Sequence, residues 1–177
     1  VNWNPGGLAA IRAEQNTRAS LFAAMKRREV YATSGPRITM NFTASSTPLS
    51  CDSKTPVGEI ISMGGEFSRT SKAPHFRIDA LYDRTPIQSI EIVKGELVEG
   101  RLEESLTEVW RSNSGSLNVC ATWEDLSFNQ ASPAFWYARV IEAPSPRWSA
   151  YHCKEAGRCD EFPEAQRTVQ ERAWASP

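Results

Sequence analysis

The sequence predicts a mainly β protein, namely an antiparallel β-sandwich preceded by an N-terminal helix-strand unit. Two observations support this prediction. Up to about residue 30, apolar residues recur at helical spacing, and from residue 37 onward they recur at every second position, the period of a half-buried strand. Roughly seven short strands separated by turn signals then follow, which is typical of a sandwich.

The N-terminal unit is predicted to be one helix followed by a short strand. Asn16 is a suitable N-cap, because its side chain can accept hydrogen bonds from the free amides of the first turn. Leu21, Phe22 and Met25 form an apolar stripe at helical spacing. The basic run at residues 26–28 falls in the last turn, where cations complement the negative end of the helix dipole.

The remaining elements follow from the alternation of apolar and polar residues, interrupted by glycine, proline and polar turns. The predicted strands span residues 30–32, 37–43, 59–63, 76–82, 87–94, 105–111, 117–123 and 134–142. Residues 134–142 are apolar on both faces, as expected of a central strand that is covered on both sides. In the 105–111 strand, Leu106 and Trp110 are expected on one face.

Three segments are expected along the chain. The Gly35-Pro36 break separates the helix-strand unit, residues 1–35, from a sandwich formed by residues 36–143. Residues 144–177 are rich in proline and are expected to form an irregular strap. This strap should pack on the sandwich, because its aromatic side chains are too apolar for a disordered end.

Composition argues against several classes of protein. Twenty Lys and Arg against 21 Asp and Glu argue against a nucleic-acid-binding protein. The sequence has no run of about 18 apolar residues, so we expect no membrane span. The first residues lack the features of a signal peptide and do not begin with Met, so we expect a piece of a longer chain. With only two histidines, His75 and His152, we expect no metal or other cofactor in this chain.

The four cysteines indicate a compartment. Cys153 and Cys159 are closely spaced around Gly157 and are the candidate disulfide pair. An even number with one such pair favours an oxidising compartment, hence a periplasmic or extracellular location. Four buried or free thiols in a cytoplasmic protein are the alternative. A zinc site that adds His152 to the close pair is disfavoured, because no second ligand pair follows at zinc spacing.

Charge is unevenly distributed and points to a candidate binding segment. Residues 1–45 carry six basic and two acidic side chains, whereas residues 96–125 carry seven acidic and two basic ones. Both stretches are solvated faces in one interpretation. In the other, the hydroxyls of Thr33 and Ser34 and the guanidinium of Arg37 bind a phosphate or carboxylate. A turn in which Arg37 pairs with a surface carboxylate explains the same residues.

No strong catalytic motif is present. The sequence contains neither a phosphate-cradling glycine loop nor a nucleophile elbow. Asp79 and Asp83 lie four residues apart, on the same face of a strand, and with His75 they form a candidate cation site. The polar face of a half-buried strand explains these three residues as well, and we favour that interpretation.

Four motifs, in order along the chain, resemble one known family. They are GGLAAIRAEQNTRASLFAAMKRREVYATSGPRI near the N-terminus, IEIVKG at 90–95, AFWYARVIEAPSPRW at 134–148 and QERAWASP at 170–177. In these motifs the chain resembles the C-terminal part of an uncharacterised family, domain of unknown function 3604. One departure is Ala19, where the family often has a glutamate that completes a capping box.

The resemblance implies a longer parent protein. Family members resemble metal-dependent phosphoesterases of the polymerase-and-histidinol-phosphatase (PHP) type, whose His and Asp ligands lie upstream of the matched segment. Residues 1–35 would then be the last helix-strand unit of a PHP-like α/β barrel. The chain would be the non-catalytic C-terminal portion of an exported hydrolase, inactive alone. Its partner would be the upstream catalytic domain with divalent metal ions, and Thr33, Ser34 and Arg37 would lie at the active-site mouth.

A stand-alone binding or assembly sandwich is the alternative function. The sequence has six tryptophans, which could form a platform for a sugar or a protein, although large aromatic residues more often fill a core. An exposed cluster of Trp3, Trp110, Trp148 and Trp174 would favour binding, because contiguous exposed apolar patches mark interaction sites.

Overall fold

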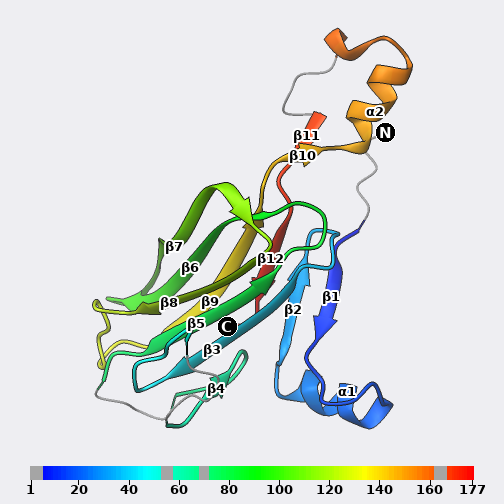
Figure 1. Cartoon of the computed structure of the whole chain (residues 1–177). Helices are drawn as coiled ribbons and strands as arrows, with labels where there is room; N and C mark the ends of the chain where they lie inside the picture. Colours follow the sequence, from blue (N-terminus) through cyan, green and yellow to red (C-terminus); the bar gives the residue numbers. More distant parts are fainter. Residues whose placement is uncertain (1–5, 53–57, 68–71, 162–166) are drawn as a thin grey trace.

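The computed structural model describes residues 6–52, 58–67, 72–161 and 167–177. Within these ranges the chain forms two facing β-sheets, one helix beside them and a small helical lobe (Figure 1). Every strand pair is antiparallel, which confirms the prediction of a mainly β, antiparallel protein.

The large sheet contains six strands in the order β1-β2-β12-β9-β6-β7. Their bounds are Leu8–Ile11 for β1, Val30–Thr33 for β2, Arg172–Ala175 for β12, Ala134–Glu142 for β9, Ile87–Val98 for β6 and Arg101–Ser116 for β7. The small sheet contains four strands in the order β4-β3-β5-β8. Their bounds are Ile61–Ser62 for β4, Thr39–Ser45 for β3, His75–Leu81 for β5 and Asn118–Glu124 for β8.

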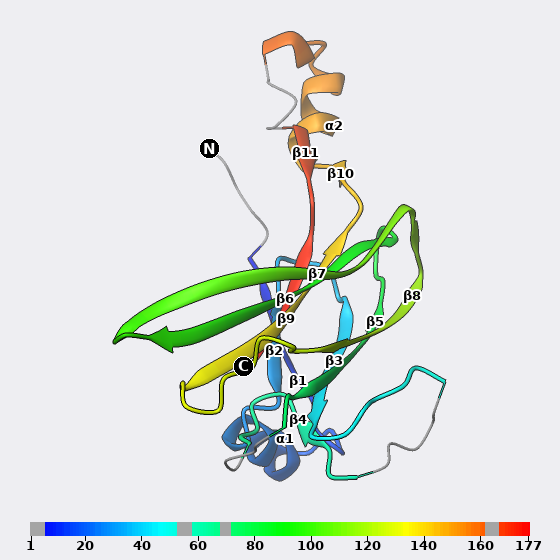
Figure 2. The same cartoon turned by 90° about the vertical axis from the view of Figure 1, so that its left-hand side faces the viewer.

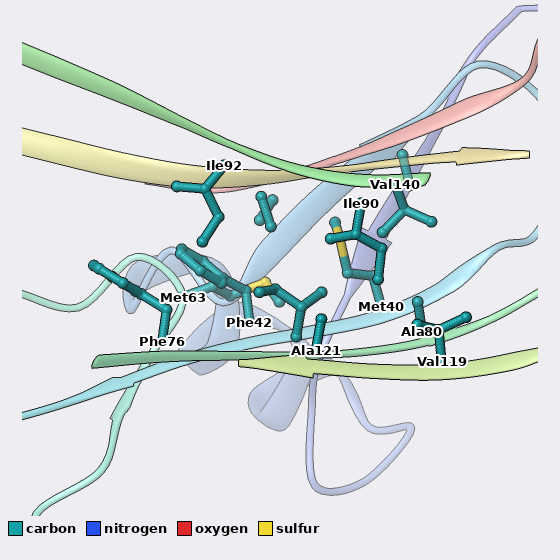
Figure 3. Packing of buried hydrophobic residues seen from close by; sticks show 14 of the residues in the cluster. Met40, Phe42, Met63, Phe76, Ala80, Ile90, Ile92, Val119, Ala121 and Val140 are labelled. Carbon is teal, nitrogen blue, oxygen red and sulfur yellow. The ribbon is translucent and has the colours of Figure 1, made fainter. Parts of the chain in front are cut away.

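The core lies between the two sheets. Along β3 and β5 the buried residues alternate with half-exposed ones, because successive side chains of a strand point to opposite faces. The inward side chains of both sheets meet in one cluster, shown in Figure 3. Its members include Met40, Phe42, Ile78, Ile90 and Val140.

Helix α1 spans Arg18–Lys26, and its N-cap is Thr17 rather than the predicted Asn16. The Thr17 hydroxyl accepts from the Ser20 amide at 3.3 Å, so it satisfies one of the free donors of the first turn. Only Ala24 of the helix is buried. The apolar stripe predicted from the sequence is therefore largely solvent-facing, with Phe22 56% and Met25 47% exposed.

The C-terminal segment is more ordered than the irregular strap expected from its prolines. It forms β10 at Ser145–Pro146, α2 at Trp148–Glu155, the 3-10 helix η1 at Cys159–Glu161 and β11 at Thr168–Val169. Strand β12 then enters the large sheet between β2 and β9. Its alternating pattern explains this position, because Ala173 and Ala175 point into the core.

The predicted boundary between residues 35 and 36 coincides with the crossing from one sheet to the other. Strand β2, before the boundary, pairs with β1 and with β12 in the large sheet. Strand β3, after it, belongs to the small sheet. The N-terminal strands and the C-terminal strand therefore share one sheet.

Strand β1 was not predicted, and two predicted strands differ most in length from the structure. The predicted strand 59–63 is reduced to the two residues of β4, whereas the predicted strand 105–111 extends to the sixteen residues of β7. Leu106 and Trp110 do not share a face, because a register shift lies between Ile90 and Glu91 of the partner strand. Trp110 packs against the core, whereas Leu106 is 51% exposed.

Two disulfides brace the chain. Cys153 and Cys159, the predicted pair, join the end of α2 to η1 within the small lobe. Cys51 and Cys120 join the loop after β3 to β8 across a sequence separation of 69 residues. No described cysteine is free.

Candidate functional site

A pocket of about 400 Å³ lies between the sheets, beside β3, β4 and β9. Its most distinctive feature is its aromatic lining. The aromatic residues are Phe42, Phe67, Phe76, Phe135 and Trp136. A concave site of this size and apolar character matches the pockets that proteins use for small molecules, so it is the candidate functional site.

The aromatic wall is built by strand alternation on both sheets. Phe42 and Phe76 point inward from β3 and β5, with ring centroids 5.4 Å apart in a stacked arrangement. Phe76 also contacts Trp136 of β9 across the sandwich, with centroids 5.5 Å apart. Phe42 and Phe76 are almost fully buried and Trp136 is half-buried, so the wall is anchored in the core and reaches the pocket.

Trp136 is fixed by a buried carboxylate. Its indole Nε1–H donates to Asp125 Oδ2 at 3.0 Å, and Asp125 is completely buried. The same carboxylate accepts from the Ser127 amide at 3.0 Å and from the Ser127 hydroxyl at 2.7 Å. The indole therefore cannot rotate without breaking a buried hydrogen bond, which preorganises this wall of the pocket.

A buried lysine completes this network. Lys94 is 4% exposed, and its Nζ lies 3.0 Å from Asp125 Oδ2 and 3.1 Å from Glu96 Oε2. Its ammonium also donates to the Ser127 carbonyl oxygen at 3.3 Å. Buried charges are tolerated when they are paired and hydrogen-bonded, as all of these are. We name Lys94, Glu96, Asp125, Ser127 and Trp136 the lysine network, and its geometry indicates a structural role.

An ion pair and a glycine stand beside the pocket. Arg28 Nη2 lies 2.6 Å from Glu66 Oε1, and both residues line the pocket with exposed side chains. Gly64 has a φ of +78°, and a Cβ at this position would overlap the Arg28 backbone. Only glycine therefore allows the 63–67 segment to approach the end of α1 this closely. The pocket therefore combines an aromatic lining with an arginine, Arg28, and a carboxylate, Glu66.

The predicted site residues lie elsewhere. None of Thr33, Ser34 and Arg37 lines the aromatic pocket. Thr33 is buried, and its hydroxyl accepts from the Gly35 amide. The Ser34 hydroxyl donates to the Glu171 carboxylate and accepts from the Arg172 amide at 2.8 Å. The Ser34 hydroxyl therefore fastens the turn to the segment at the start of β12, whereas the Thr33 hydroxyl bonds within the turn itself.

Arg37 differs from the two hydroxyl residues. Its side chain is exposed, and its backbone amide donates to Asp83 Oδ2 at 2.7 Å. Among the described residues its guanidinium makes no hydrogen bond or ion pair. The structure thus brings Thr33 and Ser34 to β12 and leaves the Arg37 guanidinium facing solvent.

The cation site considered for His75, Asp79 and Asp83 is not assembled. Asp79 is held by the Arg77 guanidinium, with Nε to Oδ2 at 2.9 Å. That hydrogen bond raises the pKa of Arg77 further above its ordinary value. Asp83 caps the Arg37 amide, and the nearest carboxylate to His75 Nε2 is that of Glu124 at 3.9 Å. In the described part of the chain, no three His, Cys, Asp or Glu residues form a potential metal site.

The tryptophans do not form an exposed platform within the described residues. Trp110 packs against the core from β7, and Trp174 is half-buried on β12. Trp148 lies on α2, where its ring meets His152 edge-on. Trp3 lies outside the described residues. The residues that gather at a pocket are instead mainly phenylalanines. Inward alternation in predicted strands was an available signal for Phe42 and Phe76, whereas Phe67 lies in no predicted strand.

Comparison with known proteins gives the family. The family model described as protein of unknown function DUF3604 matches residues 1–114 and 104–177. The chain belongs to this family. No curated protein and no solved structure matches the chain. Within the described residues, no helix of this DUF3604 member is long and apolar enough to span a membrane.

Proposed function

We propose that this DUF3604 chain is the non-catalytic C-terminal portion of a longer, exported, PHP-like metal-dependent hydrolase of phosphoester type. In this proposal the helix of residues 1–35, α1, packs against the catalytic barrel, and their strands β1 and β2 join the large sheet of the sandwich. The sandwich supports the barrel and shapes its active-site mouth, and the divalent metal ions are bound by upstream residues. The family membership and the resemblance of its motifs support this assignment.

The exposed face of α1 is the observation that carries the proposal. A nine-residue helix is marginal on its own and normally gains stability by burying an apolar face. Here Phe22 and Met25 are about half exposed, and the basic side chain of Lys26 lies over the Phe22 ring, 5.2 Å from its centroid. An additional domain that covers this face would supply the missing burial. We assign that role to the upstream catalytic domain.

The two disulfides support the proposed export. Disulfides persist in the periplasm and outside the cell and are rare in reducing compartments. Cys51–Cys120 and Cys153–Cys159 together use all four cysteines of the chain. We therefore propose a periplasmic or extracellular location.

The docking part of the proposal is tested in the protein encoded by the complete reading frame. Phe22→Ser combined with Met25→Ser should lower both its thermal stability and its phosphoester turnover, because the barrel would lose its apolar contact with α1. The same pair in the 177-residue chain should change stability little, since both side chains are already largely exposed. Leu117→Ser is the matched control, because Leu117 is 53% exposed and lies between β7 and β8. Equal effects of the pair in both proteins would contradict the docking.

The site part of the proposal is tested separately through Arg37. In the complete protein, Arg37→Ala should lower phosphoester turnover while metal content stays normal, because the exposed guanidinium has no other described partner to lose. Arg158→Ala, which removes an exposed arginine in the small lobe, is the control. Unchanged turnover of several phosphoesters by Arg37→Ala would remove Arg37 from the site and leave the docking proposal standing.

A second candidate function is small-molecule binding in the aromatic pocket, which the rigid wall of Phe42, Phe76 and Trp136 favours. Aromatic faces beside an arginine and a carboxylate suit a sugar ring, whose C–H face stacks while its hydroxyls are hydrogen-bonded. Titration of the 177-residue chain with a panel of monosaccharides should shift the Trp136 Nε1–H resonance. No shift with any sugar at millimolar concentration would reject a sugar ligand.

A further inference from the structure

The β6–β7 hairpin projects past the rest of the large sheet, as Figure 2 shows. Strand β7 is the last strand of its sheet, so within the described residues no strand pairs with its outer edge. Every residue from Arg101 to Glu108 is exposed. An edge strand that is long and exposed presents a row of unpaired backbone donors and acceptors, the template for adding another strand.

Three leucines lie on one face of this hairpin, with Glu104 between the two of β7. In the register of the two strands, Leu97 lies opposite Leu102 and Val93 lies opposite Leu106. All four side chains share the face that points away from the small sheet, because the pairing is regular from Glu91 to Val98. Leu97, Leu102 and Leu106 are 43%, 59% and 51% exposed. Leu97 and Leu102 are direct cross-strand neighbours, and Leu106 continues the same face beside Val93. Three half-exposed leucines on one face favour an interaction surface over isolated surface residues.

The same hairpin is acidic. Glu99, Glu103 and Glu104 make no ion pair with any described residue, whereas Glu108 is paired with Arg111 on the same strand. That pairing holds the pKa of Glu108 below its ordinary value, through its hydrogen bond with Arg111. Three unpaired carboxylates beside three leucines specify a partner that carries both positive charge and apolar side chains.

The acidic residues of β7 also argue against a second copy of this chain as the binding partner of this edge. Antiparallel pairing of two β7 strands, centred on this stretch, would bring their Glu103, Glu104 and Glu108 side chains near one another. Like charges opposite each other across strands are destabilising. The acidic residues therefore protect the edge from self-pairing while leaving it open to a basic strand.

We propose that β7 binds an extended basic segment of a partner protein, which adds to the large sheet as a seventh strand. Alternate side chains of such a segment point to opposite faces, as in other complexes formed by strand addition. Its apolar residues would lie beside Leu102 and Leu106 on one face, and its Lys or Arg residues would pair with Glu103 on the other face, while Glu104 adds to the negative potential of the edge. This inference does not depend on the hydrolase assignment.

Isothermal titration calorimetry measures the binding of an eight-residue peptide, which alternates lysine with leucine, to the 177-residue chain. Leu102→Ser with Leu106→Ser should weaken binding about tenfold or more, because the apolar contact is lost. Glu103→Lys with Glu104→Lys should weaken it by a similar factor and reduce its salt dependence. Leu81→Ser is the control, because Leu81 is 46% exposed on the small sheet.

A modified peptide separates strand addition from simple charge attraction. Methylation of alternate backbone nitrogens removes the donors along one edge of the peptide and keeps every side chain, so it should abolish binding. Unchanged binding after methylation, or unchanged binding to the leucine variant, would overturn the proposal. If the chain forms a dimer and Leu102→Ser with Leu106→Ser abolishes that dimer, the edge binds a second copy of the chain, and the proposal of a basic partner segment is wrong.

Discussion

Asp125→Ala tests the lysine network and the rigidity that it gives to the aromatic pocket. The substitution removes a completely buried carboxylate that bonds Trp136, Ser127 and Lys94. Lys94 is then left almost fully buried, with Glu96 as its one remaining carboxylate among the described residues. The Trp136 indole N–H loses its hydrogen-bond acceptor, Asp125 Oδ2, as well.

The expected loss of stability follows from these contacts. Removing one member of a buried ion pair costs about 3–5 kcal/mol, and each buried donor without an acceptor costs about 1–3 kcal/mol. The terms overlap, so we expect a loss of about 4 kcal/mol in the free energy of unfolding, against about 5–15 kcal/mol for a whole domain. Urea unfolding followed by tryptophan fluorescence, with both disulfides intact, measures it.

A double variant and a control sharpen this prediction. Lys94→Met with Asp125→Ala should lose less stability than the sum of the two single variants, by about 1–3 kcal/mol, because the double variant leaves no unpaired lysine. Arg158→Gln breaks an exposed ion pair with Glu161 and should leave the unfolding midpoint unchanged. A loss below about 1 kcal/mol for Asp125→Ala, as for an exposed pair, would refute the reasoning. Strict additivity in the double variant would do the same.

Three further predictions concern the sheets, the disulfides and the hairpin. Gly95→Val should lower thermal stability by about 1–3 kcal/mol, since a Cβ there would overlap the Phe135 ring, whereas Gly6→Ala, with open space around it, should be neutral. Removing Cys51–Cys120 should lower the free energy of unfolding by about 4 kcal/mol and removing Cys153–Cys159 by about 2 kcal/mol, because the first disulfide closes the longer loop. Equal losses in urea unfolding would contradict an explanation by loop entropy. Arg111→Gln should raise the pKa of Glu108 toward its ordinary value in an NMR titration, and no change would mean that the pair is absent in solution. Because the pKa of Glu108 is lowered, the Glu108–Arg111 pair stabilises the fold above the ordinary glutamate pKa, and this contribution is lost as the pH falls through the lowered pKa. Its effect on stability is small because Glu108 is exposed.

The alternation of apolar and polar residues predicted the fold class well and the boundaries of the strands poorly. The inward residues of β3 and β5 were identifiable because each strand is covered on one face. The length of β7 was not identifiable, because its exposed stretch has no buried face to impose a period. Strand β12 was not predicted, because the prolines before it indicated an irregular segment. Its place between β2 and β9 could not be predicted either, because strand order depends on contacts between residues far apart in sequence.

The candidate site was predicted less completely than the fold. The close cysteine pair could be predicted from spacing, whereas Cys51 and Cys120 are brought together by the pairing of distant segments. Thr33 and Ser34 have the residue types of an anion site, but their hydroxyls bond Gly35 and the segment around Glu171. The lysine network joins β6, β9 and the loop between β8 and β9, and no local pattern connects these segments.

Metal analysis of two proteins tests the proposed function most directly. The 177-residue chain and the product of the complete reading frame would be purified identically and measured by elemental analysis, alongside hydrolysis of a phosphoester. We predict about two or more divalent metal ions per molecule and hydrolysis for the complete product, with neither in the chain alone. Stoichiometric metal and hydrolysis in the 177-residue chain, or neither in the complete product, would contradict the account.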